Sequence, residues 1–224
     1  MTGFPFDIVG FDLDGTLFDT SVDLANAVNH VLGLLGRPAL GVDAVRPMIG
    51  RGGKYMLQQG LEASGGCDPA VLERSYPELL AFYGDNLTRN THAFPGLIEA
   101  MDALEGHGAK LAIVTNKAED LAVSLVAELG LSHRFACVIG GDTMGPDGRK
   151  PSPAGIHEMI RRCGGGRAAF VGDSIFDIAA ARNAGIPSIG VGFGFLTGPV
   201  ADLGADAVID HFDELVPALE WLGA

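Results

Sequence analysis

Cysteine is scarce in this sequence and shows no pattern that would pair it. The 224 residues include three cysteines, Cys67, Cys137 and Cys163, an odd number without C-x-x-C spacing. We therefore expect no disulfide framework and interpret the three residues as reduced thiols of a cytoplasmic protein. The six histidines are scattered singly, so a histidine-ligated zinc site is not expected either.

Positive charge is also in short supply. Fifteen Lys and Arg residues stand against 28 Asp and Glu residues, which gives a formal net charge of −13. Binding to nucleic acid or to an anionic membrane depends on clustered Lys and Arg, so we expect neither partner. A small anionic substrate needs only a local positive site and stays compatible with this balance.

Long hydrophobic runs are missing as well. No charge-free apolar stretch reaches the roughly 18 residues that a membrane helix needs. The first residues, MTGFPFDIVGFD, lack the basic segment of a secretory signal. We expect a cytoplasmic protein, monomeric or homodimeric, without a membrane partner.

The chain does contain a regular alternation of short Val- and Ile-rich runs with longer segments of helical period. This pattern is typical of a parallel sheet with crossover helices, and consecutive apolar residues in the runs indicate a sheet covered on both faces. We predict a Rossmann-like α/β fold with helices on both faces of the sheet. The predicted strands cover residues 6–11, 110–115, 135–141, 168–173, 188–193 and 205–210.

The segment after the first predicted strand departs from this alternation. Residues 18–89 contain no convincing strand but three or four helical stretches, the first of which begins TSVDLANAV. Thr20 and Asp23 have the spacing of a capping box there. One crossover helix needs far fewer residues. We therefore predict a helical cap domain over 18–89, inserted into an α/β core of 1–17 and 90–224.

Polar residues follow four of the predicted strands. In an open parallel sheet, ligands bind beyond the carboxyl ends of the strands, so we expect these residues to share one site. They are Asp12-Leu13-Asp14, Thr115-Asn116, Lys150 beyond a glycine-rich stretch, and Asp173-Ser174 with Asp177.

Asp12 and Asp14 stand two residues apart on an extended segment and therefore face the same side. Two neighbouring carboxylates are tolerated if a hard divalent cation lies with them, and Asp173 would add a third oxygen ligand. A ligand set made of oxygens, without Cys or His, favours Mg²⁺.

The other groups at this edge suit an anion beside the metal. Lys150 supplies a point charge and Thr115 supplies a hydroxyl group. Asn116 is expected to cap a helix that begins near Lys117, whose free N–H groups and dipole would favour a phosphate. The sequence thus predicts a phosphate-binding site at the edge of the sheet.

Two aspartates are candidate catalysts of a reaction at this phosphate. The chain has no G-x-x-x-x-G-K-[ST] phosphate loop. Asp12, if it faces the phosphorus, is a candidate carboxylate nucleophile that would form an aspartyl phosphate. Asp14 is a candidate to protonate the leaving oxygen and then to activate the hydrolytic water.

The order DLDGT, VTN, KPSP and GDSIFD along the chain resembles the haloacid dehalogenase superfamily of Mg²⁺-dependent phosphatases. The resemblance covers nearly the whole chain. It implies a nucleophile at Asp12 and an acid/base catalyst at Asp14, whose backbone carbonyl would also reach the metal. The other implied roles are metal binding by Asp173 and, one layer further out, by Asp177, and phosphate binding by Thr115 and Lys150.

Within that superfamily, DGTLFDT, PMIGRGG, FPGL and GGDTMGPDGRKPSP are similar to the bacterial phosphoglycolate phosphatases. This similarity implies 2-phosphoglycolate, a small phosphorylated metabolite, as the substrate. The alternatives are hydrolysis of a sugar phosphate or of pyrophosphate, a phosphomutase of the same superfamily, and a non-catalytic phosphate-binding protein. The residues further expected to contact substrate are Asn116, Ser174, Gly50 and Arg51.

Overall fold

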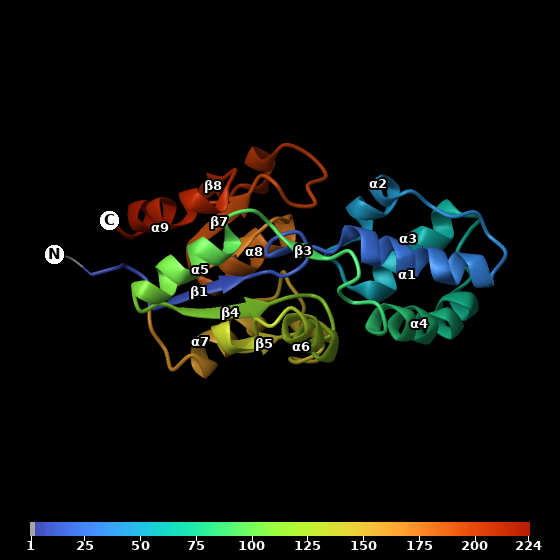
Figure 1. The fold of residues 1–224 in the computed structure, drawn as a ribbon, viewed down its shortest axis with the longest axis horizontal. Coiled ribbons are helices and arrows are strands. Elements are labelled where there is room, and N and C mark those ends of the chain that lie inside the picture. The colour runs from blue at the N-terminus through green and yellow to red at the C-terminus, as the bar shows by residue number, and fades with distance from the viewer. Residues whose placement is uncertain (1–2) are drawn as a thin grey trace.

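Six parallel strands form the central sheet of the molecule (Figure 1). The structure is a computed structural model that describes residues 3–224. The strands lie in the order β5-β4-β1-β6-β7-β8, and each runs parallel to its neighbours. Their bounds are β1 Ile8–Phe11, β4 Lys110–Val114, β5 Phe135–Ile139, β6 Ala168–Gly172, β7 Ser188–Val191 and β8 Ala207–Ile209.

Helices cover both faces of this sheet, because side chains of alternate strand residues point to opposite faces. On β1, Val9 and Phe11 belong to one apolar cluster and Ile8 to the other; on β4, Ile113 and Val114 divide in the same way. Helices α5, α6 and α9 pack in the first cluster, and α7 and α8 pack in the second. The predicted Rossmann-like α/β fold is confirmed. The bounds are α5 Leu97–Gly106, α6 Glu119–Glu128, α7 Ala154–Arg162, α8 Ile175–Ala184 and α9 Leu215–Gly223.

The chain between β1 and α5 forms four helices that lie together beyond one end of the sheet (Figure 1). We call these four the cap helices. They share a buried apolar interior, which includes Val28, Leu57, Leu61 and Leu79. The exact domain bounds, 18–89 and 1–17 with 90–224, stay a prediction. The cap helices are α1 Ser21–Leu34, α2 Val42–Val45, α3 Gly53–Ala63 and α4 Pro69–Gly84.

Two short strands join the sheet to the cap helices. β2 (Phe18–Asp19) pairs antiparallel with β3 (His92–Ala93), where the chain leaves the sheet and where it returns. The prediction that residues 18–89 contain no strand is therefore wrong at Phe18–Asp19. A strand of two residues is too short to show a periodic pattern, and it forms only because its distant partner lies beside it.

Asp23 of α1 fastens the returning chain to the first cap helix. Its buried carboxylate accepts hydrogen bonds from the backbone N–H and the side chain of both Asn90 and Thr91, at 2.7 to 2.9 Å. The expected capping box is wrong, since Thr20 makes no side-chain bond to the first turn of α1. Its hydroxyl donates to the Asp14 carboxylate instead, because an ionised oxygen is the stronger acceptor.

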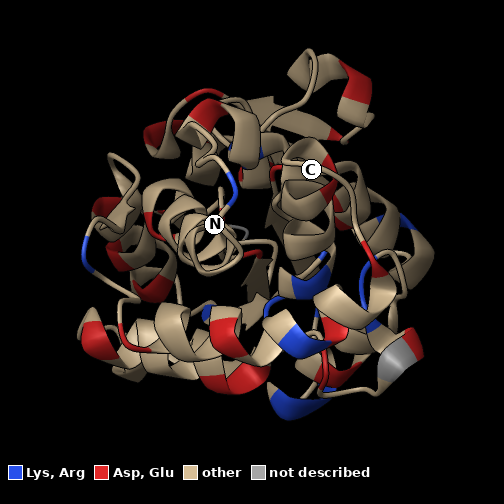
Figure 2. Cartoon of the chain, turned by 90° about the vertical axis from the view of Figure 1, so that its right-hand side faces the viewer, with Lys and Arg blue, Asp and Glu red and all other residues tan. Residues whose placement is uncertain are grey.

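The distribution of charged residues over the fold reflects the acidic composition. Figure 2 shows Asp and Glu residues on most of the elements in view, with fewer Lys and Arg between them. Among the helices formed by residues 3–224, none has both the length and the apolarity to cross a membrane.

Candidate active site

The residues predicted from the strand ends lie together at the carboxyl edge of the sheet. Asp12 follows β1, Thr115 follows β4 and Asp173 follows β6, which are three neighbouring strands. Lys150 arrives from the segment between β5 and α7. Each of these four residues is at most 5% exposed, so their charges interact with little screening by water.

Asp12, Asp173 and Asp177 form an acidic cluster. Each offers a carboxylate oxygen, and these oxygens lie within 4.8 Å of one another. Burial, followed by the charges of Asp177 and Asp12, raises the pKa of Asp173 well above its usual value. Burial also raises the pKa of Asp12 to about 6, against the lowering effect of Lys150. Three buried carboxylates at this separation call for additional positive charge.

Two members of this acidic cluster have oxygens that suit a divalent cation. Asp12 Oδ1 is buried and forms an ion pair with Lys150 Nζ at 2.8 Å, but it accepts no hydrogen bond from the described residues. Asp173 Oδ2 accepts from the backbone N–H of Phe195 at 2.7 Å, whereas Oδ1 has, among residues 3–224, only a long contact of 3.4 Å with the Thr16 hydroxyl. Carboxylate oxygens with unused lone pairs of this kind are ligands for a hard cation such as Mg²⁺.

Gly15 allows Asp173 to come this close to the first loop. Its φ of +85° lies in the left-handed region that favours glycine. A Cβ atom at this position would also clash with the Asp173 carboxylate and with the ring of Phe195. The glycine of DGT is therefore required by the approach of two loops from separate strands.

Asp177 orients its neighbours through both of its oxygens. Oδ1 accepts from Lys150 Nζ at 2.6 Å, and Oδ2 accepts from the backbone N–H and the hydroxyl of Ser174 at 2.9 and 2.5 Å. Ser174 and Asp177 form the capping box of α8. Lys150 Nζ also donates to the Val114 carbonyl at 2.8 Å. The ammonium of Lys150 is thus fixed from three directions, and the Ser174 hydroxyl is engaged within the cap of the helix.

Asp14 faces a second buried lysine. Its two carboxylate oxygens lie 2.9 and 3.0 Å from Lys117 Nζ, and Oδ1 also accepts from the Thr20 hydroxyl at 2.8 Å. Lys117 Nζ donates further to the hydroxyl of Tyr83, on α4, at 2.8 Å. Burial opposes the charged form of Lys117, but Asp14 and Tyr83 outweigh it, so the pKa of Lys117 is raised. Lys117 is therefore an ammonium ion at neutral pH.

Asn116 connects loops and does not cap a helix. The prediction of an Asn116 cap is wrong, because α6 begins only at Glu119, whose N–H donates to the Asp142 carboxylate at 2.9 Å. Asn116 Nδ2 donates to the carbonyls of Gly50 and Lys150 at 2.9 and 3.2 Å, and Oδ1 accepts from the Lys150 N–H at 2.8 Å. Its amide thereby links the loop before α3, which contains Gly50, to the loop that contains Lys150.

Gly50 and Arg51 are neighbours in sequence but lie differently. Gly50 lines the pocket described below, and Arg51 is not among the residues that line it. The Arg51 guanidinium lies 4.0 Å from the ring centroid of Tyr55 and 5.5 Å from that of Phe176. It forms an exposed cation–π contact that bridges α3 and the first turn of α8.

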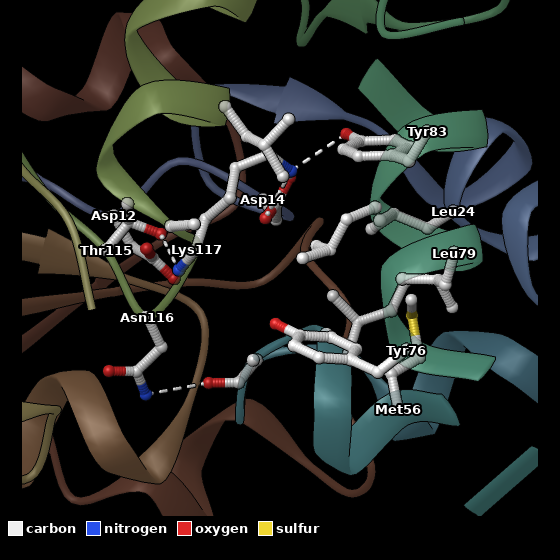
Figure 3. Close-up of a pocket in the computed structure, with 17 residues that line it drawn as sticks. Asp12, Asp14, Leu24, Met56, Tyr76, Leu79, Tyr83, Thr115, Asn116 and Lys117 are labelled. Atoms are coloured by element: carbon white, nitrogen blue, oxygen red, sulfur yellow. Dashed lines mark hydrogen bonds and ion pairs between the residues drawn. The ribbon is translucent and has the colours of Figure 1, made fainter. Parts of the chain in front are cut away.

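A pocket lies between the sheet edge and the cap helices (Figure 3). The polar side chains from the core loops are those of Asp12, Asp14, Thr115, Asn116 and Lys117. The opposite wall comes from the cap segment and is mostly apolar or aromatic. It consists of Leu24, Ile49, Met56, Tyr76, Leu79, Leu80 and Tyr83, with the backbone of Gly50, Gly52 and Gly53.

Residues 9–191 match the family model of the haloacid dehalogenase-like hydrolases. The chain belongs to this family. Membership in a hydrolase family agrees with the site, because the acidic cluster and the two buried lysines suit an anionic ester.

Relatives with assigned names indicate the class of reaction that this hydrolase catalyses. It is 41% identical over 212 residues to the phosphoglycolate phosphatase of Agrobacterium fabrum, covering 93% of this chain and 90% of the relative. It is 40% identical to the phosphoglycolate phosphatase of Mesorhizobium japonicum, covering 95% and 94%. This haloacid dehalogenase-like hydrolase is an enzyme of the phosphoric monoester hydrolase class, a phosphatase similar to the phosphoglycolate phosphatases.

A solved structure agrees in fold. A crystal structure described as a predicted phosphoglycolate phosphatase from Haemophilus somnus 129PT superposes with a TM-score of 0.88 at 28% identity. It covers 95% of this hydrolase and 97% of the other chain. The similarity therefore includes the cap helices as well as the sheet.

Sequence reasoning missed Lys117, Tyr83 and Thr20, which surround Asp14. Lys117 directly follows the Thr115-Asn116 pair, and its position one residue further along that loop was the available signal. Tyr83 lies within a cap helix whose pattern indicates only a buried face. Its hydroxyl reaches the site of this hydrolase only because α4 packs above the sheet edge.

Proposed function

We propose that this phosphatase hydrolyses 2-phosphoglycolate with Mg²⁺ as its cofactor, through an aspartyl-phosphate intermediate on Asp12. The observation that carries the proposal is the buried cluster of Asp12, Asp173 and Asp177 with Lys150 Nζ 2.8 Å from the Asp12 carboxylate. The names of the Agrobacterium and Mesorhizobium relatives support the choice of substrate.

In this proposal Asp12 and Lys150 act on the phosphoryl group. The Asp12 carboxylate attacks phosphorus, an acyl-phosphate bond forms, and the bond from phosphorus to the ester oxygen breaks. Lys150, held by Asp177 and the Val114 carbonyl, keeps its ammonium beside Asp12 and offsets the charge of the phosphoryl oxygens. Thr115 lies at the same strand edge and supplies a hydroxyl donor.

Asp14 handles the protons. In its protonated form it donates this proton to the departing glycolate oxygen, and the resulting carboxylate then removes a proton from the water that attacks the aspartyl phosphate, which regenerates Asp12 and protonated Asp14. The cap helices limit access of bulk water to this step, because their apolar side chains form the opposite wall of the pocket.

Asp12 and Asp173 would hold the Mg²⁺ ion, with Asp177 behind them as a positioning residue. When bound, the ion supplies electrostatic stabilisation of the phosphoryl oxygens and relieves the repulsion within the acidic cluster. Its requirement is tested by dialysis against a chelator and by restoring Mg²⁺, Mn²⁺ or Ca²⁺ one at a time. Full activity in excess chelator would remove the ion from the proposal.

The test of the substrate is a panel assayed with the purified full chain and Mg²⁺. The panel contains 2-phosphoglycolate, 2-hydroxyethyl phosphate, several sugar phosphates and pyrophosphate, and the readout is inorganic phosphate. We expect the highest kcat/KM for 2-phosphoglycolate. A higher value for a sugar phosphate or for pyrophosphate would contradict the substrate assignment and leave the phosphatase chemistry intact.

We further infer that the enzyme acts in the cytoplasm, as a monomer or homodimer, on small phosphorylated metabolites. The acidic composition and the three free cysteines support this inference. Gel filtration with light scattering of the full chain measures the oligomeric state, and a larger assembly would contradict it.

A further inference from the structure

The pocket between the sheet edge and the cap helices contains one cationic side chain among the described residues that line it, Lys117. Lys150 is engaged with Asp12, Asp177 and the Val114 carbonyl, on the side of the nucleophile. Arg51 stacks on aromatic rings outside the lining. Any anionic group of the substrate other than the phosphate therefore has Lys117 as its available cationic partner in the described lining.

Lys117 lies beside the position of the leaving group. It contacts both oxygens of Asp14, at 2.9 and 3.0 Å. Asp14, in the proposed function, is the residue that protonates the leaving oxygen. An ammonium at hydrogen-bond distance from this carboxylate is within reach of a group carried one or two atoms beyond the ester oxygen. A carboxylate at that place would meet Lys117 Nζ.

Tyr83 fixes the ammonium from the cap side. Its hydroxyl accepts from Lys117 Nζ at 2.8 Å, and Lys117 Nζ lies 4.4 Å from the Tyr83 ring centroid (Figure 3). Burial raises the pKa of Tyr83 to about 12, so it is a neutral partner, and Asp14 is the group that balances the charge of Lys117. The rest of the cap wall is largely apolar. A neutral leaving group would therefore find no charged side chain on that wall.

We propose that Lys117 is the specificity-determining residue of this site. The Lys117 ammonium binds a carboxylate on the leaving group, and Tyr83 positions that ammonium. The inference rests on the proposed function. A buried charge without a partner is costly, so Lys117 is shared between Asp14 and the substrate carboxylate. A substrate that lacks the carboxylate leaves Lys117 bound to Asp14 alone and gains nothing from it. The site therefore selects small phosphate esters of hydroxycarboxylic acids.

The experiment compares two substrates that differ only in this group, 2-phosphoglycolate and 2-hydroxyethyl phosphate. We define the selectivity as the ratio of their kcat/KM values. Lys117→Met removes the charge and keeps the length of the side chain, and we expect it to lower the selectivity at least about 30-fold, as for loss of a buried charge pair. Lys54→Met is the matched control, because Lys54 is partly exposed on α3, pairs with Glu73 and does not line the pocket. It should leave the selectivity unchanged.

The outcomes separate the two proposals. If the wild-type enzyme prefers 2-phosphoglycolate but Lys117→Met lowers kcat/KM equally for both substrates, Lys117 only positions Asp14, and the specificity inference is overturned while the proposed function stands. If the wild-type enzyme itself shows no preference for 2-phosphoglycolate, both are overturned.

A second measurement applies if Lys117→Met does not fold. The wild-type enzyme should be inhibited competitively by glycolate at concentrations at which ethylene glycol has no effect. Tyr83→Phe, which removes one hydroxyl group, should weaken inhibition by glycolate several-fold. Equal inhibition by glycolate and ethylene glycol contradicts a carboxylate site, and unchanged inhibition in Tyr83→Phe contradicts the positioning role of Tyr83.

Discussion

The two walls of the pocket differ in chemistry and in the origin of their order. The core wall is charged: Asp14 is bonded to Lys117, and Asp12 forms an ion pair with Lys150 behind the wall. The cap wall consists mainly of Leu, Ile, Met and Tyr side chains. The comparison teaches that the core supplies the chemistry of the reaction, whereas the cap supplies shape and exclusion of water. Tyr83 crosses this division through its bond to Lys117, and Gly50 crosses it through the bond that its carbonyl accepts from Asn116.

The largest effect is expected from the core wall, at the nucleophile. Asp12→Asn should lower kcat for every phosphate ester on the order of 10⁵-fold, because an amide cannot form the acyl phosphate. The measurement is phosphate release under saturating substrate, with Asp202→Asn as the control for an exposed aspartate of the core. An Asp12→Asn enzyme within tenfold of the wild type would refute the aspartyl-phosphate mechanism.

The next effect concerns proton transfer by Asp14. Asp14→Asn should lower kcat/KM for 2-phosphoglycolate about 10² to 10⁴-fold, the usual worth of a general acid. p-Nitrophenyl phosphate has a leaving group that needs no proton, so its first turnover, followed as a burst of nitrophenolate, should be nearly unchanged while later turnovers slow. Equal slowing of the burst and of the later turnovers would show that Asp14 is not the general acid.

A smaller effect is expected from the cap wall. Leu79→Ala removes a side chain that is 1% exposed and lines the pocket. It should lower the free energy of unfolding by about 2 to 4 kcal/mol and raise KM several-fold with little change in kcat. Leu61→Ala is the matched variant, because Leu61 is equally buried among the cap helices but does not line the pocket.

Unfolding in urea and steady-state kinetics measure the two quantities. Both variants should lose similar stability, and only Leu79→Ala should change KM. The same change of KM in Leu61→Ala would mean that general loosening of the cap, and not the shape of its wall, determines substrate binding.

The smallest effect is expected outside the pocket. Arg51→Ala removes an exposed cation–π contact, typically worth about 0.5 to 1 kcal/mol. We expect KM for 2-phosphoglycolate to change less than about threefold, with Arg74→Ala of α4 as an exposed control. A rise of tenfold or more in KM for Arg51→Ala alone would place its guanidinium on the substrate.

Sequence patterns were sufficient for the sheet. All six parallel strands begin or end within two residues of their predicted bounds, because buried parallel strands are continuous apolar runs. The gathering of Asp12, Thr115, Lys150 and Asp173 followed from topology, since loops after neighbouring parallel strands meet at one edge. Local patterns were less reliable at Thr20 and Asn116, which were expected to cap helices. The Thr20 hydroxyl bonds to the buried Asp14 carboxylate instead, and the Asn116 amide bonds to nearby backbone groups.

By itself, the sequence determined the α/β class, the position of the charged loops and their family, since these depend on the order of motifs and the period of apolar residues. Only the tertiary structure decided that Lys117 pairs with Asp14, that Tyr83 reaches this pair from α4, and that Arg51 lies outside the pocket. These contacts join residues from separate elements, and no local period records them. They depend on how the cap helices pack above the sheet edge. The buried ammonium of Lys117 needs oxygen partners there, and the packing determines that these are the oxygens of Asp14 and Tyr83.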